Sequence, residues 1–171
     1  MTSSTTMRAA PPPVAVSHIS PWKASIYGGI VTAVIAVIFH FLLPMNQPIL
    51  YGLALLLLGA GPVLGYQLAA GKLGSDWGAI VGGILGSILP IVSQLLLWPL
   101  FVWLFNRRFS LGRLYLGSLI GIVLAFVVFF AIGFMMGQDP YTWIGLAWTL
   151  AASVWGGSAA AGMTGSAEDA R

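Results

Sequence analysis

The chain has 171 residues, of which 58% are hydrophobic and only 6% are charged. Soluble domains carry about 25% charged residues, so this composition excludes an ordinary soluble enzyme, a disordered chain and a nucleic-acid-binding module. It predicts an all-α protein of the cell or inner membrane, built as a polytopic bundle of transmembrane helices with the lipid bilayer as its main partner.

The first 23 residues differ in composition from the rest of the chain. Residues 1–6 are rich in Ser and Thr, and three consecutive prolines follow at 11–13. This pattern predicts a flexible N-terminal tail over residues 1–23. No apolar run of the signal-peptide type follows Arg8, so we expect the first span to act as an uncleaved targeting signal.

Two spans are expected between Lys23 and Lys72, because this long stretch contains no Asp, Glu, Lys or Arg. A helix needs about 20 apolar residues to cross the hydrocarbon core. The natural break is at residues 44–48, which contain two prolines and two side-chain amides. The sequence therefore predicts spans at 24–43 and 49–71.

Residues 77–105 form the longest uncharged segment predicted as a single span, about 43 Å as a helix. Trp77 lies at one end and Trp103 at the other, and Trp77 and Trp98 would be about 31 Å apart, as in two interfacial belts. This spacing favours a single tilted or proline-kinked helix. The alternative is a re-entrant hairpin that bends back at residues 87–90.

Two further spans are expected at 114–136 and 141–162, followed by a tail at 163–171. Five spans would divide the basic residues four against three between the two sides, which decides little about orientation. With the hairpin, all seven would be cytoplasmic and only Asp139 would mark the outer loops. We expect the basic residues between helices to set orientation or to contact lipid headgroups: Lys23, Lys72, Arg107, Arg108 and Arg113.

Small residues recur every four positions within the predicted helices, and residues four apart lie on one helix face. Such faces allow the close approach of helices that supplies packing energy in lipid. Some rows arise by chance, since the chain has 22 glycines. The two rows that we expect to pack, within the chain or between subunits, are Gly78, Gly82, Gly86 and Gly145, Thr149, Ser153, Gly157.

Few polar side chains fall inside the predicted spans, and those that do are candidates for function because burying them in lipid is costly. Gln94 lies near the middle of the third segment, beside Ser93 and one turn after Pro90. Its amide could satisfy the backbone carbonyl that the proline frees. It could equally line a cavity or contact a substrate, and both readings stay open.

His40 is the other candidate. Residues 36–40 are similar to the AxxxH pattern of bacterial light-harvesting polypeptides, and this resemblance implies a pigment or haem ligand. An interfacial histidine is the alternative. Trp148 and Trp155, seven residues apart on one face, indicate packing or lipid contact, with ligand stacking as a minor alternative.

No catalytic motif, intramembrane carboxylate pair or cysteine is present in the sequence, so we expect no enzyme activity, no metal and no cofactor. The leading hypothesis is a scaffold or accessory subunit of a membrane complex that packs through its small-residue faces. The second is a small-solute transporter or channel subunit with a midplane site near Gln94. The third is a pigment- or haem-binding protein that uses His40.

Overall fold

The computed structural model describes residues 19–42, 48–89, 91–136 and 140–165, and every regular element in these ranges is a helix. The expectation of an all-α bundle is confirmed. The outer parts of both predicted tails and Pro90 lie outside the described residues. The helices are α1 (Pro21–Leu42), α2 (Pro48–Leu58), α3 (Ala60–Ala69), α4 (Trp77–Gly86), α5 (Val92–Phe105), α6 (Leu111–Met136) and α7 (Pro140–Gly162).

Four helical stretches within the described residues are long and apolar enough to cross a membrane. They are Pro21–His40, Gly52–Ala69 (which joins α2 and α3), Leu111–Met136 and Trp143–Gly162. Only 11% of the α6 stretch is buried within the bundle, and Val127 and Phe130 on its outer face are more than half exposed. The bundle therefore has an apolar outer surface along this helix, which is the surface that lipid would cover.

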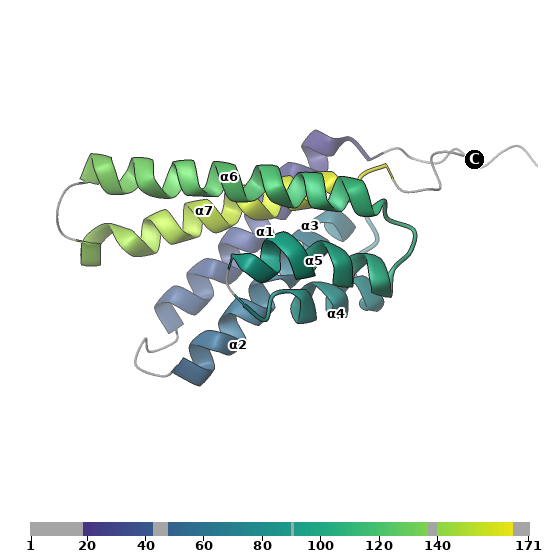
Figure 1. The fold of residues 1–171 in the computed structure, drawn as a ribbon, viewed down its shortest axis with the longest axis horizontal. Helices are drawn as coiled ribbons and strands as arrows, with labels where there is room; N and C mark the ends of the chain where they lie inside the picture. The colour runs from purple at the N-terminus through teal and green to yellow at the C-terminus, as the bar shows by residue number, and fades with distance from the viewer. Residues whose placement is uncertain (1–18, 43–47, 90, 137–139, 166–171) are drawn as a thin grey trace, which may run out of the picture.

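The third predicted span is two short helices and not one. Helix α4 ends at Gly86, with Ser87 as its C-cap, and α5 returns antiparallel to it (Figure 1). Ile91 takes a φ of +64° at this turn, a conformation that breaks the helix. The single long helix favoured by the aromatic spacing is wrong, and residues 77–105 instead contain a hairpin of two short helices.

The spacing of tryptophans misled because Trp98 does not lie at an interface. Its side chain is 0% exposed and belongs to the main hydrophobic core. Trp77 begins α4 and Trp103 is near the end of α5, so the antiparallel hairpin places both at its base. Trp77 and Trp103, which the single-helix interpretation places at opposite ends, therefore lie at the same end of the hairpin.

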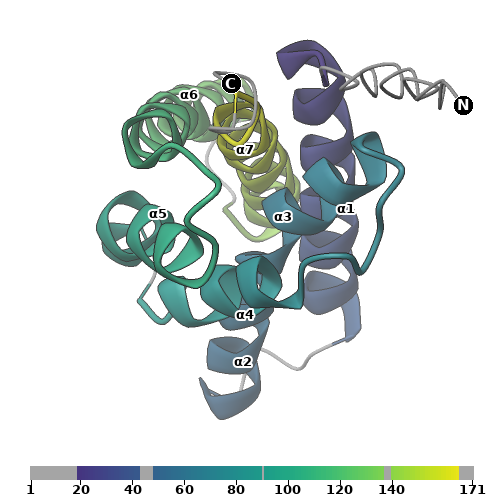
Figure 2. The same cartoon turned by 90° about the vertical axis from the view of Figure 1, so that its right-hand side faces the viewer.

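The long helices pack around α7, which contacts α1 on one side and α6 on the other. Figure 2 shows α1 and α5 on opposite sides of the bundle, with α3 beside α1 and α4 beside α5. Glycine allows the closest approaches, since a Cβ on Gly117 would lie 2.7 Å from the Ser158 carbonyl oxygen. Helices α6 and α7 therefore touch through their backbones.

Candidate functional site at the tip of the hairpin

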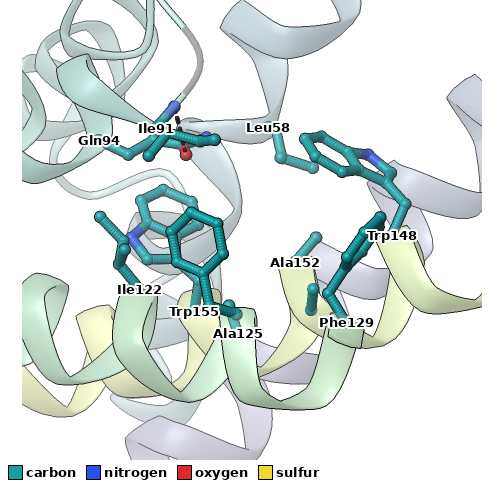
Figure 3. Close-up of a pocket in the computed structure, with 11 residues that line it drawn as sticks. Leu58, Ile91, Gln94, Ile122, Ala125, Phe129, Trp148, Ala152 and Trp155 are labelled. Carbon is teal, nitrogen blue, oxygen red and sulfur yellow. Dashed lines mark hydrogen bonds between the residues drawn. The ribbon is translucent and has the colours of Figure 1, made fainter. Parts of the chain in front are cut away.

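A cavity of about 80 Å³ lies where the tip of the α4–α5 hairpin meets α2, α6 and α7. Figure 3 shows Gln94 and Ile91 on one side of this space and the rings of Trp155, Phe129 and Trp148 around the rest of it. Its lining is almost wholly apolar. The residues are Leu58, Ile91, Gln94, Ile122, Ala125, Phe126, Phe129, Trp148, Ala151, Ala152 and Trp155.

Gln94 is the residue with a polar amide in this lining, and it is only 7% exposed. Its Oε1 accepts a hydrogen bond from the backbone N–H of Ile91 at 3.2 Å. Only the carbonyl oxygen of an amide can accept a hydrogen bond from an N–H. This bond therefore identifies the amide atom nearest the Ile91 N–H as the oxygen and the other as the nitrogen. The Nε2 atom makes no hydrogen bond to another described residue, and Gln94 lines the cavity.

Ser93 and Gln94 together satisfy backbone groups at the start of α5. The Ser93 hydroxyl oxygen accepts from the N–H of Leu89 at 2.9 Å and also donates to the Leu89 carbonyl. Ser93 therefore bonds the backbone of Leu89, and Gln94 bonds the N–H of Ile91 and not a carbonyl freed by the proline. Gln94 is also one of the residues that line the cavity. Pro90, the third expected site residue, lies outside the described residues.

The start of α5 is held in place by a short chain of hydrogen bonds. The Ser118 hydroxyl of α6 donates to the Gln94 carbonyl oxygen at 2.5 Å. The indole Nε1 of Trp155 in α7 donates to the Ser118 hydroxyl oxygen at 3.1 Å. Ser118 is 0% exposed. Two long helices therefore fix the position of Gln94, and Ser118 was not singled out by the sequence.

Trp98 connects the hairpin to the break between α2 and α3. Its Nε1 donates to the carbonyl oxygen of Gly59 at 2.8 Å, and its ring meets that of Trp155 edge to face at 5.7 Å. Gly59 has no room for a Cβ, because the Gly83 carbonyl and the Ser87 hydroxyl lie against it. No signal in the sequence pairs Trp98 with Gly59, since the two are 39 residues apart.

The predicted small-residue faces lie against other helices of the same chain. An added Cβ would lie 3.1 Å from the Phe105 oxygen at Gly78, 2.6 Å from the Phe101 oxygen at Gly82 and 2.5 Å from Trp98 Cα at Gly86. On α7, a Cβ added at Gly157 would lie 2.7 Å from the Ser25 carbonyl oxygen, and the Ser153 hydroxyl donates to the Gly29 carbonyl at 3.1 Å. Gly145 faces His40, and Thr149 is half-buried.

The imidazole of His40 packs against α7 at Gly145. A Cβ added there would come within 2.6 Å of His40 Cε1 and 2.7 Å of Cδ2, and the Nε2 atom is closer still. A macrocycle bound at Nε2 needs open space on that side of the ring, so this packing does not favour the pigment or haem reading. No group of three metal-ligating side chains lies together among the described residues.

The basic residues that the structure describes gather at one end of the bundle. Lys23 is in the first turn of α1, Lys72 follows α3, and Arg107 and Arg108 follow α5; Figure 1 shows these helix ends at the same pole. Arg113 is in the first turn of α6, at the same pole. The Arg107 guanidinium lies 3.9 Å from the centre of the Trp103 ring.

At that same pole the base of the hairpin is tied together. The Asp76 carboxylate accepts from the Ala79 N–H at 3.0 Å, which caps α4, and from the Asn106 amide after α5. The Gln67 amide donates to the Asp76 carbonyl at 2.9 Å. Polar contacts therefore join the two helices of the hairpin at its base, and the tip of the hairpin borders an apolar cavity.

Comparison with known proteins adds no family to this geometry. The chain matches no family model, and neither a curated protein nor a solved structure is significantly similar to it.

Proposed function

We propose that the chain is a multi-pass integral membrane protein that binds a small solute in the cavity at half depth, as a binding or transport protein. The observation that carries the proposal is the hairpin tip. It ends beside an apolar cavity and presents the Gln94 Nε2 donor, for which the described residues supply no acceptor.

The membrane placement is supported by surface and charge. Four stretches are long enough to cross, and the described basic side chains share one pole, which the positive-inside tendency would place in the cytoplasm. Trp22 and Trp77, 76% and 69% exposed, begin α1 and α4 at that pole, where an aromatic belt would lie. Four crossings and one hairpin would place the start of α1 and the end of α7 on the same side.

The depth of the cavity follows from helix lengths. Helices α4 and α5 have 10 and 14 residues, which is about 15 Å and 21 Å along their axes. The tip would therefore lie near the middle of a hydrocarbon core of about 30 Å. Irregular backbone at that depth is tolerated where it is buried in protein or lines a cavity. The described residues on either side of the turn fit both conditions, because Ser87 is 1% exposed and Ile91 lines the cavity.

A binding role has more structural support than a catalytic role or a scaffold role. The Gln94 amide is neither an acid nor a base, so we propose no enzymatic role for the cavity. A scaffold or accessory subunit is the weaker proposal, since the small-residue rows that motivated it face helices of the same chain. These rows are therefore occupied without any partner.

The test is to fill the cavity and compare bound solutes. The protein is purified in mild detergent and examined by native mass spectrometry as wild type, Ala152→Phe and Ala131→Phe. Ala152 lines the cavity, whereas Ala131 is exposed on α6 and is the matched control. We expect a small molecule bound to the wild type and the control but absent from folded Ala152→Phe. Binding that survives the filling, or no bound molecule in any of the three, would refute the proposal.

A further inference from the structure

The chemistry of the cavity wall restricts what it can hold. Four aromatic rings line it, from Phe126, Phe129, Trp148 and Trp155. An apolar site of this kind penalises ions and sugars, which would lose hydration without compensating hydrogen bonds. It favours a planar ring, which gains from edge and face contacts with aromatic side chains.

The polar chemistry of the site is that of a hydrogen-bond donor. Gln94 Oε1 is occupied by the Ile91 N–H, and the Trp155 Nε1 is occupied by Ser118. Figure 3 shows the six-membered ring of Trp148 toward the cavity and its nitrogen on the far side. Among the described residues that line the cavity, the Nε2 of Gln94 is the side-chain donor without a partner, so a ligand that satisfies it must carry an acceptor, for which a carbonyl oxygen is suited.

Two of the residues that line the cavity are also partly exposed on the surface of the bundle. Ile91 and Phe126 line it and are 42% and 41% exposed, and their neighbours Val92 and Val127 are 58% and 60% exposed. In a bilayer this surface would face hydrocarbon. An engineered cavity of about 150 Å³ holds benzene, so 80 Å³ encloses one edge of a ring while the remainder stays in the opening.

We infer that the cavity binds a neutral, lipid-soluble ring compound bearing a carbonyl group, of the aromatic ketone or quinone class. The ligand enters from the bilayer between Ile91 and Phe126, and its carbonyl oxygen accepts from Gln94 Nε2. This inference rests on the proposed function, and it adds the ligand class and the route. Ser118 and Trp155 act as positioning residues, because they hold the Gln94 backbone without offering a free polar atom to the ligand.

The test uses two ligands that share a fused ring and differ in the carbonyl groups, 2-methyl-1,4-naphthoquinone and 2-methylnaphthalene. Their binding is measured by equilibrium dialysis against phosphatidylcholine nanodiscs that contain the full chain, with empty nanodiscs subtracted. The wild type should bind the quinone roughly tenfold more tightly than the hydrocarbon, as one hydrogen bond contributes. Gln94→Met should lose this preference, and Ala131→Phe should keep it.

The outcomes separate this inference from the proposed function. Equal binding of both compounds by the wild type, abolished by Ala152→Phe, would overturn the carbonyl specificity and leave a solute-binding cavity. A preference that persists in folded Gln94→Met would overturn the role of the amide. If the wild type binds neither compound while native mass spectrometry finds a solute that Ala152→Phe loses, the ligand class is wrong and the proposed function stands. Failure of both experiments would refute both.

Discussion

The bundle packs differently on its two sides. On the side of α1, α6 and α7, small residues bring the helix backbones into contact, as where Gly157 meets the Ser25 carbonyl. At the tip of the hairpin, Trp148, Trp155 and Phe129 surround open space instead. In lipid, helix association depends on van der Waals packing more than on the hydrophobic effect. Small residues therefore close an interface, whereas large rings around a short hairpin leave room for a ligand.

The hairpin itself combines the two modes of packing. Its arms touch through Gly78, Gly82 and Gly86, while its tip carries Ser93 and Gln94. The glycine contacts keep the hairpin thin enough to fit beside α3 and α6. The polar tip then satisfies backbone groups that would otherwise be unpaired in an apolar environment. The same hairpin therefore combines two tightly packed helices with a tip that borders the cavity.

The largest effect should come from separating the arms of the hairpin. Gly82→Leu would place a Cβ 2.6 Å from the backbone oxygen of Phe101, which cannot move without shifting α5. We expect a loss of stability of about 3 kcal/mol or more, at the upper end of overpacking effects. Thermal unfolding in detergent measures it. The control is Gly52→Leu in α2, because a Cβ there has no neighbour within 4 Å.

An unchanged melting temperature for Gly82→Leu would show that α4 and α5 do not touch along this face. A fall of equal size for Gly52→Leu would show that leucine is harmful at any glycine, whatever its neighbours.

A second prediction compares the same substitution at two alanines of α7, one in the packed core and one at the cavity. Ala159 is 0% exposed in the core of α7, whereas Ala152 lines the cavity. Ala159→Leu should cost about 1–3 kcal/mol through overpacking. Ala152→Leu should leave stability unchanged or raise it, since the added carbons fill space. Equal destabilisation of the two variants in thermal unfolding would argue against a cavity at the tip.

A smaller effect should come from the hydrogen bond between Trp98 and Gly59. Trp98→Phe removes the Nε1 donor and leaves the buried Gly59 carbonyl without that partner, at a cost of about 1–2 kcal/mol. Trp22→Phe is the matched control, because Trp22 is 76% exposed and should change stability little. If the two variants melt alike, the indole bond contributes nothing to the closure of α2 and α3 on the hairpin.

Much of the fold could be predicted from the sequence, because apolar runs between charges mark helices directly. The runs located all four stretches that are long enough to cross. The third run failed because length and aromatic spacing do not distinguish one long helix from two short ones. The glycines at 78, 82 and 86 were read as a packing face, but their partner, the returning α5, could not be inferred from periodicity.

The candidate site could be predicted only in part. Gln94 and Ser93 were identifiable because they are polar residues within an apolar run. Ser118, Trp98 and Gly59 were not, because their roles depend on contacts between residues far apart in the chain. Trp148 and Trp155 were recognised as sharing a face, but only the tertiary structure places that face at a cavity.

The most direct test of the re-entrant hairpin is the sidedness of its two ends. Ser75 precedes α4 and Ser110 follows α5, and both are exposed. The chain has no cysteine, so Ser75→Cys and Ser110→Cys each introduce a single labelling site. In sealed vesicles treated with a membrane-impermeant maleimide, we expect both positions to be labelled from the same side. Labelling from opposite sides would mean that residues 77–105 cross the membrane, and would contradict the hairpin.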